Sequence, residues 1–277
     1  MIRFTVLGSG STGNSVLINT ETTNVLVDAG LSARETLRRL ELVGIQPTQL
    51  NGILITHEHS DHAGGLRVLL NSVSCPVYIS DLTKAAYLEL KTGSQNLETE
   101  SRRRRAAVDG RTESIESDRE FRIGDIDFEP FTVPHDAADN FGFVAKKDGL
   151  RMATLMDFGH ITDLMCNRLE ACDAVVIESN HSKEMLKACD VYSWDLKQRI
   201  MGDYGHLSNE DLSEWLAHDF DGAARFIVLA HLSQKANEPN LAKIMAETSL
   251  QMRPTGRATS AEVSLSRHTN PTPWITL

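Results

Sequence analysis

The sequence predicts an α/β (α+β) chain in which helices cover two sheets. The predicted elements follow the order βββα-β-α-β-α, then βββ, then αβαβα. This order groups the strands in two sets, whereas one doubly wound sheet would alternate strand and helix throughout. Strands that are wholly apolar, such as Gly52–Thr56, indicate sheets buried on both faces. A length of 277 residues with 41% hydrophobic side chains is enough for a sizeable core.

The first part of the chain is rich in strands. Ile2–Leu7 is an alternating, β-branched run, and a polar turn at 20–23 joins two further strands. Ser32 precedes Glu35 by three residues, a capping-box pattern that predicts a helix ending at Gly44. The elements expected here are strands at 2–7, 15–19, 24–28, 52–56 and 76–80, and helices at 36–43, 62–71 and 82–91.

The second part of the chain begins with strands and then alternates. Ser208 is positioned to cap a helix that starts at Asn209. The elements expected here are strands at 126–133, 141–146, 152–156, 174–178 and 226–230, and helices at 161–170, 183–201, 209–218 and 240–249.

Residues 92–120 separate these two parts. They are highly charged and nearly free of large apolar side chains, so we expect a charged surface loop or insertion in a single domain spanning 1–277. The run Arg102–Arg105 in this segment is either a solvated surface or a contact for a phosphate backbone.

Composition limits the function and the compartment. The formal charge of −10 excludes a protein that holds nucleic acid by bulk positive charge, although local phosphate binding at metal ions stays open. The four cysteines show no CxxC spacing, which favours a reduced cytoplasmic protein over a disulfide framework. We expect no secretion signal and no membrane span, because neither the N-terminus nor any other stretch has the required apolar run.

The glycines at positions 8, 10 and 13 match the GxGxxG pattern of dinucleotide-binding proteins. That motif requires a helix to open inside the glycines, whereas Ser15–Asn19 lacks helical spacing and predicts a hairpin. We therefore expect no nucleotide cofactor. The glycines more readily form a tight loop whose N–H groups face a site.

The segment Thr56–His62, of sequence THEHSDH, is the strongest chemical signal in the chain. In an extended stretch, residues two apart point to the same side, so His57, His59 and Asp61 converge and His62 joins as the helix begins. Imidazole and carboxylate ligands suit zinc, manganese and iron. Because the segment holds no cysteine, we expect a metal site that keeps positions open for water and substrate.

The HxHxDH pattern after an apolar strand resembles the signature of the metallo-β-lactamase superfamily. The resemblance implies a four-layer αββα sandwich with its metal site at one edge of two sheets. It extends over nearly the whole chain. Four more residues at strand ends match the motifs of this superfamily, namely Asp28 in LVDAG, His135 in TVPHDA, Asp157 in ATLMDFGH and His231 in VLAHLS.

Four further segments resemble one branch of this superfamily, the nuclease-related YycJ/WalJ-like proteins. These segments are GSGSTGNS, ESNH, GHLSNED and AHLSQKANEP. The branch is related to tRNase Z, RNase J and the cleavage-factor nucleases, but the 73 residues between Asp157 and His231 leave no room for the large β-CASP domain of the last two. In the first segment, Ser11 and Asn14 become candidates for supporting the site or contacting substrate.

The resemblance also implies the roles of the ligands. His57, His59 and His135 would hold one divalent ion, and Asp61, His62 and His231 a second. Asp157 would bridge the two ions, which we expect to be zinc or manganese. Such a pair clamps the oxygens of an in-line displacement and activates the water between them. Asp28 would orient a ligand histidine.

Other residues carry two interpretations each. Ser208 is either a helix N-cap alone or part of a helix N-terminus aimed at a phosphate, with His206 as a phosphate ligand or leaving-group acid. His181 in ESNH either packs in the interior or contacts the substrate. Asp61 either binds metal alone or also relays a proton.

The function expected from all of this is a two-metal phosphodiesterase that degrades nucleic acid from an end, with DNA favoured over RNA. One alternative is a small-molecule thioester or lactone hydrolase, since this fold also supports acyl chemistry. Another is a non-catalytic, metal-stabilised binding domain, although binding alone needs no open bimetallic centre.

Overall fold

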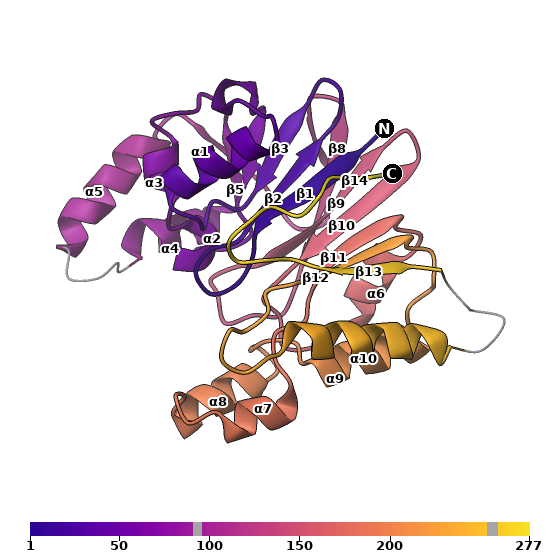
Figure 1. Cartoon of the computed structure of the whole chain (residues 1–277). Coiled ribbons are helices and arrows are strands. Elements are labelled where there is room, and N and C mark those ends of the chain that lie inside the picture. The colour runs from indigo at the N-terminus through magenta and orange to yellow at the C-terminus, as the bar shows by residue number, and fades with distance from the viewer. Residues whose placement is uncertain (91–95, 254–259) are drawn as a thin grey trace. The chain divides into compact units, whose positions relative to one another are not determined.

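The computed structural model describes residues 1–90, 96–253 and 260–277 (Figure 1). Two compact units can be distinguished in it. Unit 1 comprises Met1–Pro130, Ala137–Phe141 and Arg267–Thr276, and unit 2 comprises Phe131–Asp136, Gly142–Ser266 and Leu277. In the described ranges, no helix is long and apolar enough to cross a membrane.

Unit 1 is built on a mixed sheet. Its first four strands in space pair antiparallel, and the pairings from β3 to β6 are parallel. In spatial order the strands are β14 (Ile275–Thr276), β1 (Arg3–Gly8), β2 (Ser15–Asn19), β3 (Asn24–Val27), β4 (Gly52–Leu54), β5 (Val77–Ile79) and β6 (Thr112–Ser114). An antiparallel hairpin, β7 (Phe121–Ile123) and β8 (Ile126–Thr132), follows β6.

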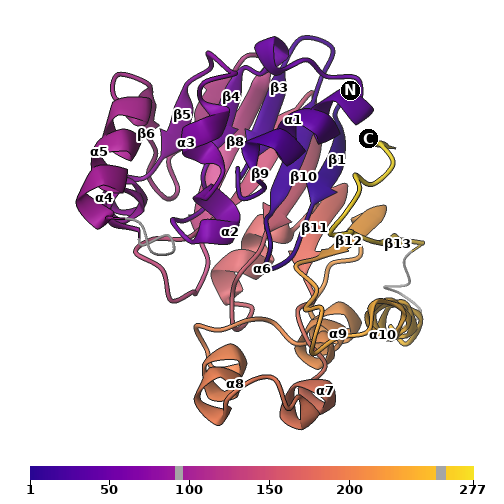
Figure 2. The same cartoon turned by 60° about the vertical axis from the view of Figure 1, so that its left-hand side comes forward.

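The helices of unit 1 connect the parallel strands, as Figure 2 shows. They are α1 (Ala33–Leu42), the 3₁₀ turn η1 (Pro47–Gln49), α2 (Ser60–Ala63), α3 (Leu66–Leu69), α4 (Asp81–Glu89) and α5 (Leu97–Val108). The predicted Ser32 cap is confirmed, since the amide of Glu35 donates to Ser32 Oγ at 3.3 Å. One core unites sheet and helices through side chains such as Leu26, Leu40 and Leu66.

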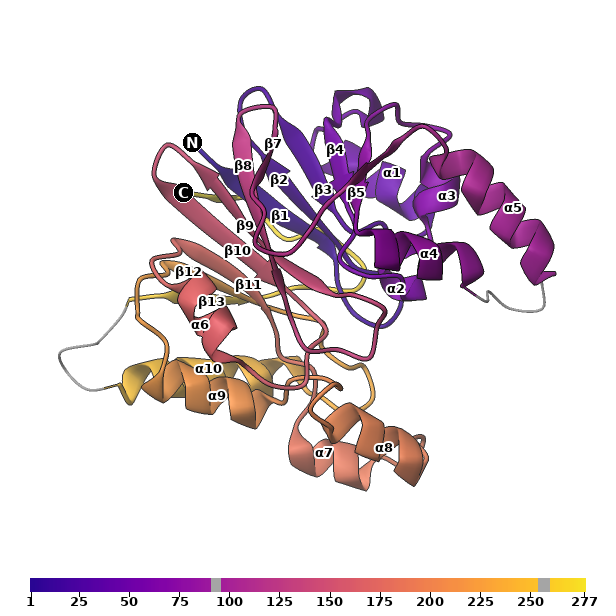
Figure 3. The ribbon, with the colours of Figure 1, turned by 180° about the vertical axis from the view of Figure 1, so that it is seen from behind.

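Unit 2 contains a sheet in which three neighbouring pairs are parallel, so that their carboxyl ends share one edge. The strands, in spatial order, are β13 (Glu262–Leu265), β12 (Phe226–Ala230), β11 (Ala174–Glu178), β10 (Leu150–Leu155) and β9 (Phe141–Lys147). The helices are α6 (Asp163–Leu169), α7 (Lys183–Ala188), α8 (Trp194–Met201), α9 (Asn209–His218) and α10 (Pro239–Gln251). Figure 3 shows α9 and α10 side by side, and α7 and α8 as a pair beyond the end of the sheet.

The structure corrects the expectation of a loop at 92–120. Residues 92–95 lie outside the described part, but Leu97–Val108 form a helix and Thr112–Ser114 a strand that pairs with β5. Asn96 caps this helix, and the buried Arg104 donates to the carbonyls of Tyr87 and Leu90. Side-chain pairing at i,i+3 and i,i+4 supports such a polar helix, so low apolar content alone does not indicate a loop here.

Two predicted helices are each divided in the structure. The helix expected at 62–71 is two short helices, α2 and α3, separated by Gly64 and Gly65. A Cβ at Gly65 would lie 1.9 Å from the carbonyl oxygen of Leu31, so a side chain there would displace backbone. The helix expected at 183–201 is divided into α7 and α8 by residues 189–193.

Candidate metal centre

The THEHSDH segment of unit 1 gathers three imidazoles at the end of β4. Ring centroids lie 4.7 Å apart for His57 and His59, and 4.1 Å apart for His57 and His62. His57 and His62 are fully buried, whereas His59 and Asp61 are half-buried. The three histidines of the segment thus lie together, and Asp61 Oδ2 lies 3.7 Å from His62 Nε2.

The buried carboxylate of Asp28, directly after β3, fixes two of these rings. His62 Nδ1 donates to Asp28 Oδ2 at 2.7 Å. The hydroxyl of Thr56 lies 3.0 Å from both Asp28 oxygens and 3.0 Å from His57 Nδ1, so it donates to the carboxylate and accepts from His57. Burial raises the pKa of Asp28, although charge attraction and hydrogen bonds from His62 and Thr56 oppose that shift.

The glycine loop supports the same segment. Asn14 Nδ2 donates to His62 Nε2 at 2.9 Å and lies 3.4 Å from Asp61 Oδ2. Its backbone amide donates to the carbonyl of Asp61 at 2.7 Å. Ser11 is exposed, and in the described part of the chain its side chain makes no hydrogen bond to the other predicted residues. The structure therefore brings Asn14 to the cluster, whereas a substrate contact by the exposed Ser11 stays a prediction.

In unit 2, three adjacent strands deliver polar residues to one edge of the sheet. Asp157 follows β10, Glu178 ends β11 and His231 follows β12. One ligand atom from each of these, and one from His206, all lie within 4.8 Å of one another. The parallel register makes this meeting possible, since Ile177 pairs with both Leu155 and Leu229.

Glu178 is the centre of this second cluster and is fully buried. Its Oε1 accepts from His206 Nδ1 at 2.9 Å and from His231 Nδ1 at 2.8 Å, and its Oε2 accepts from the amides of Phe158 and Leu207. Burial favours the neutral acid, but His206 and His231 outweigh it and lower the pKa of Glu178 to about 2. Burial likewise opposes the charged ring of His206, whose pKa is nevertheless raised by Glu178.

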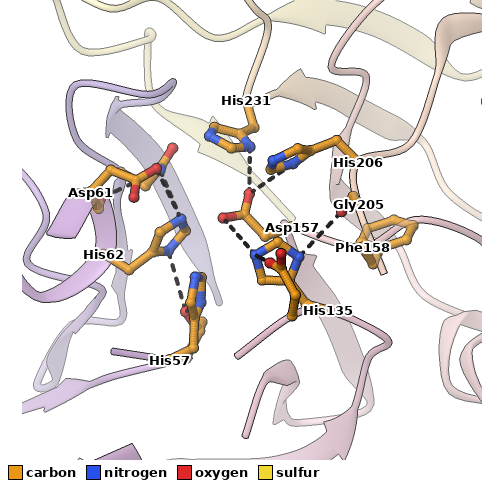
Figure 4. Close-up of polar contacts among 12 residues, drawn as sticks. His57, Asp61, His62, His135, Asp157, Phe158, Gly205, His206 and His231 are labelled. Atoms are coloured by element: carbon orange, nitrogen blue, oxygen red, sulfur yellow. Dashed lines mark hydrogen bonds and ion pairs between the residues drawn. The ribbon is translucent and has the colours of Figure 1, made fainter. Parts of the chain in front are cut away.

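Asp157 lies among three imidazoles of the same unit (Figure 4). It makes a short contact with His231 Nδ1, and its oxygens lie 3.8 Å from His206 Nδ1 and 3.9 Å from His135 Nε2. His135 Nδ1 donates to the carbonyl of Gly205 at 3.2 Å. The predicted residues His135, Asp157, His206 and His231 are therefore close together.

Backbone conformation contributes to both clusters. Asp28, Asp157 and His231 have φ values of 66°, 60° and 53°, in the left-handed region that L-residues seldom adopt. Each of the three comes one or two residues after a strand, where this conformation turns the chain sharply. Aspartate and histidine tolerate it better than β-branched residues do. Such strain is typical of functional sites.

The donor chemistry of both clusters fits divalent metal ions. In His57, His135, His206 and His231, Nδ1 is hydrogen bonded to a hydroxyl, carboxylate or carbonyl, so that each ring offers the lone pair of Nε2. Nδ1 of His62 is held in the same way by Asp28, and Nε2 of His62 accepts from Asn14. Metal-binding histidines in proteins are held in this way through their other ring nitrogen. Neutral imidazole and carboxylate are ligands of zinc and manganese.

Two of the predicted supporting residues lie beside this cluster. Ser208 caps α9, because its Oγ accepts from the amide of Asp211 at 3.0 Å. His181 forms a β-bridge with Ser208 and is 1% exposed, and burial lowers its pKa to about 4. The predicted cap by Ser208 is present, and a substrate contact for either residue stays a prediction.

A buried amide network joins the three loops of unit 2. Asn180 Nδ2 donates to the carbonyl of His231, Asn237 Nδ2 to the carbonyls of Ser179 and Asn180, and Asn209 Nδ2 to Asn237 Oδ1, all at 2.8 or 2.9 Å. One asparagine comes from each of the segments ESNH, GHLSNED and AHLSQKANEP. The network therefore fixes the backbones from which Glu178, His206 and His231 project.

Glu178 is the residue that the sequence analysis missed. Its signal was a single acid at the end of the apolar strand AVVIE. That acid becomes conspicuous once β11 is known to lie between β10 and β12, because both neighbours end in ligand-type residues. The pairing of these strands is long-range, and the spacing along the chain does not reveal it.

Comparison with known proteins identifies the family. The family described as "Beta-lactamase superfamily domain" matches residues 23–232. The chain belongs to this superfamily. This chain is 35% identical over 262 residues to Exodeoxyribonuclease YycJ of Bacillus anthracis, across 95% of this chain and 94% of that protein. It is 36% identical over 240 residues to Exodeoxyribonuclease WalJ of Streptococcus pneumoniae, across 87% and 85%.

A solved structure supports the fold of this superfamily member. The metallo-β-lactamase fold protein YhfI of Bacillus subtilis superposes with a TM-score of 0.69 over 98% of both chains, at 15% identity. The predicted fold class and the resemblance to the YycJ/WalJ-like branch are thereby confirmed. The chain is a metal-dependent hydrolase.

Proposed function

We propose that this hydrolase is a two-metal phosphodiesterase that degrades nucleic acid, DNA in preference to RNA, from a strand end. The observation that carries the proposal is 35% identity across 95% of the chain to a protein named exodeoxyribonuclease. The ligand residues expected of the superfamily are all present in this chain. Within each unit, these residues lie close together. A nuclease needs no nucleophilic side chain when metal ions supply the reactive water.

The proposed division of the ligands is the one that the sequence analysis predicts. His57, His59 and His135 would hold one ion, Asp61, His62 and His231 would hold the other, and Asp157 would be shared between them. When bound, the ions polarise the phosphodiester oxygens and lower the pKa of water. Asp28 and Glu178 orient the imidazoles through Nδ1. His206 is in position to contact a phosphate or protonate a leaving group, because Glu178 fixes its ring.

Metal content provides the first test. Elemental analysis after reconstitution with zinc or manganese is expected to give about two ions per chain, and activity should vanish on chelation. His59→Ala should lose metal and activity while circular dichroism stays that of the wild type, because His59 is only half-buried and lies between β4 and α2. One ion or none at saturating metal contradicts the bimetallic site.

The substrate test compares linear DNA, which has strand ends, with closed circular DNA, which has none. Labelled linear DNA should be degraded, closed circular DNA of the same sequence should persist, and RNA should be cleaved more slowly. Equal cleavage of linear and circular DNA would contradict end-dependence. Hydrolysis of a thioester or lactone panel without any cleavage of nucleic acid would move the function to acyl hydrolysis. His206→Ala should lower turnover at unchanged metal content, whereas loss of metal would assign His206 to ligand support.

A further inference from the structure

The segment from Gly202 to His206, between α8 and α9, has its backbone fixed at every residue. Within the segment, the amide of Gly205 donates to the carbonyl of Gly202 at 2.8 Å, and that of His206 to the carbonyl of Ile200 at 2.9 Å. The carbonyl of Asp203 accepts from His160 Nδ1 at 3.0 Å. The segment is therefore a rigid part of unit 2 although it connects two helices.

The same segment is tied directly to a predicted metal ligand. The carbonyl of Tyr204 accepts from the amide of Asp136 at 3.1 Å, and the carbonyl of Gly205 accepts from His135 Nδ1 at 3.2 Å. A Cβ at Gly159, two residues after Asp157, would lie 2.3 Å from the carbonyl oxygens of Gly202 and Asp203. Tyr204 thus lies at the margin of the metal cluster of unit 2, two residues before His206.

The side chain of Tyr204 contrasts with its fixed backbone, because it is 63% exposed. Among the large apolar side chains exposed in the described part of the chain, Tyr204 and Trp194 are the aromatic ones, and they flank the two ends of α8. Trp194 lies at the far end of that helix, about 12 Å along its axis from the end next to Tyr204. Tyr204 therefore presents an exposed ring from a fixed backbone beside the site.

We propose that Tyr204 is the stacking platform for the unpaired terminal base of a nucleic acid substrate, an inference that rests on the proposed function. A chain of charge −10 gains little from general attraction to a polyanion, so binding must depend on uncharged contacts as well as on the metal ions. Base stacking on an aromatic ring provides such a contact without sequence preference. The fixed backbone reduces the entropic cost of ordering the ring on binding.

The experiment compares single-stranded DNA substrates that differ only in the nucleotide at the attacked end, which either carries a base or is abasic. The abasic nucleotide is placed at the 5′ end in one substrate and at the 3′ end in another. For the wild type, the abasic end should raise KM by about 5- to 150-fold, which is stacking of about 1–3 kcal/mol at 1.4 kcal/mol per tenfold. Tyr204→Ala should raise KM of the normal substrate to that of the abasic one, with kcat and metal content unchanged. Tyr204→Phe should retain wild-type KM, because the ring face stacks and not the hydroxyl.

Trp194→Ala is the matched control, since it removes an exposed aromatic ring from the other end of α8, and it should behave as the wild type. A terminal 2-aminopurine, bound to the Asp157→Asn protein so that cleavage is slow, should lose fluorescence by stacking. Adding Tyr204→Ala to the same variant should restore the fluorescence. Two results would overturn the stacking role while leaving the nuclease activity in place. One is an equal KM of the wild type for the normal and the abasic substrate, and the other is a rise in KM for both substrates in Tyr204→Ala. Absence of any cleavage of nucleic acid by the wild type overturns the proposed function and this inference together.

Discussion

Each unit uses one buried carboxylate to hold its histidines, yet the two carboxylates differ in acidity. Asp28 accepts directly from one imidazole, and burial raises its pKa. Glu178 is just as buried but accepts from two imidazoles, and their attraction lowers its pKa to about 2. At equal burial, the second imidazole partner of Glu178 accounts for the opposite direction of its pKa shift.

The two clusters also differ in how the chain delivers their ligands. In unit 1, one segment of seven residues provides His57, His59, Asp61 and His62. In unit 2, His135, Asp157, His206 and His231 come from four separate loops, and Glu178 and the asparagine network hold three of them together. A local cluster depends on the conformation of one segment, whereas a dispersed cluster depends on tertiary contacts.

The largest expected effect comes from exchanging carboxylates for amides in the two clusters. Asp157→Asn should lower turnover at least about 100-fold, more than Asp61→Asn, because a neutral amide cannot bridge two cations. Asparagine also tolerates the left-handed φ of 60° at position 157, so the fold is retained. Steady-state kinetics and elemental analysis measure both variants. Wild-type turnover in Asp157→Asn would show that this residue is not the bridging ligand.

An intermediate effect is expected for the two supporting carboxylates. Asp28→Asn and Glu178→Gln should each weaken metal binding or turnover by about 10- to 100-fold. Glu178→Gln should be the more damaging, because Glu178 accepts four hydrogen bonds and a side-chain amide would point its NH₂ at two of those donors. Chelator competition measures the metal affinities.

Asp127→Asn, which alters a surface pair with Arg122, is the control for these two variants and should leave metal affinity unchanged. A larger loss of metal affinity in Asp28→Asn than in Glu178→Gln would contradict the expectation that Glu178 is the more important of the two supporting carboxylates.

The smallest effect concerns the helix caps. Ser32 Oγ accepts from the amide of Glu35 in unit 1, and Ser208 Oγ accepts from that of Asp211 in unit 2. Each Ser→Ala variant should lose about 1 kcal/mol of unfolding free energy in chemical denaturation. If capping is the whole role of Ser208, turnover should be alike in the two variants. A drop in turnover confined to Ser208→Ala would assign the start of α9 to substrate binding.

The sequence was most informative where the signal is local. The THEHSDH alternation, the capping pattern at Ser32 and the strands at 15–19, 174–178 and 226–230 depend on neighbouring residues, and the structure contains them all. The assignment of His135, Asp157 and His231 came from a family resemblance and not from spacing. The ligand roles of these residues, and the pairing of ions with ligands, stay predictions.

By itself, the sequence determined where the strands lie and which segments carry ligand-type side chains at their ends, because residue type and strand periodicity are properties of short segments. Tertiary structure alone decided that Glu178 accepts from both His206 and His231, and that three asparagines join the loops. The physical reason is that these features arise from pairing and packing between segments far apart in the chain. The register of β10, β11 and β12 places their ends together, and no pattern within one strand contains that register.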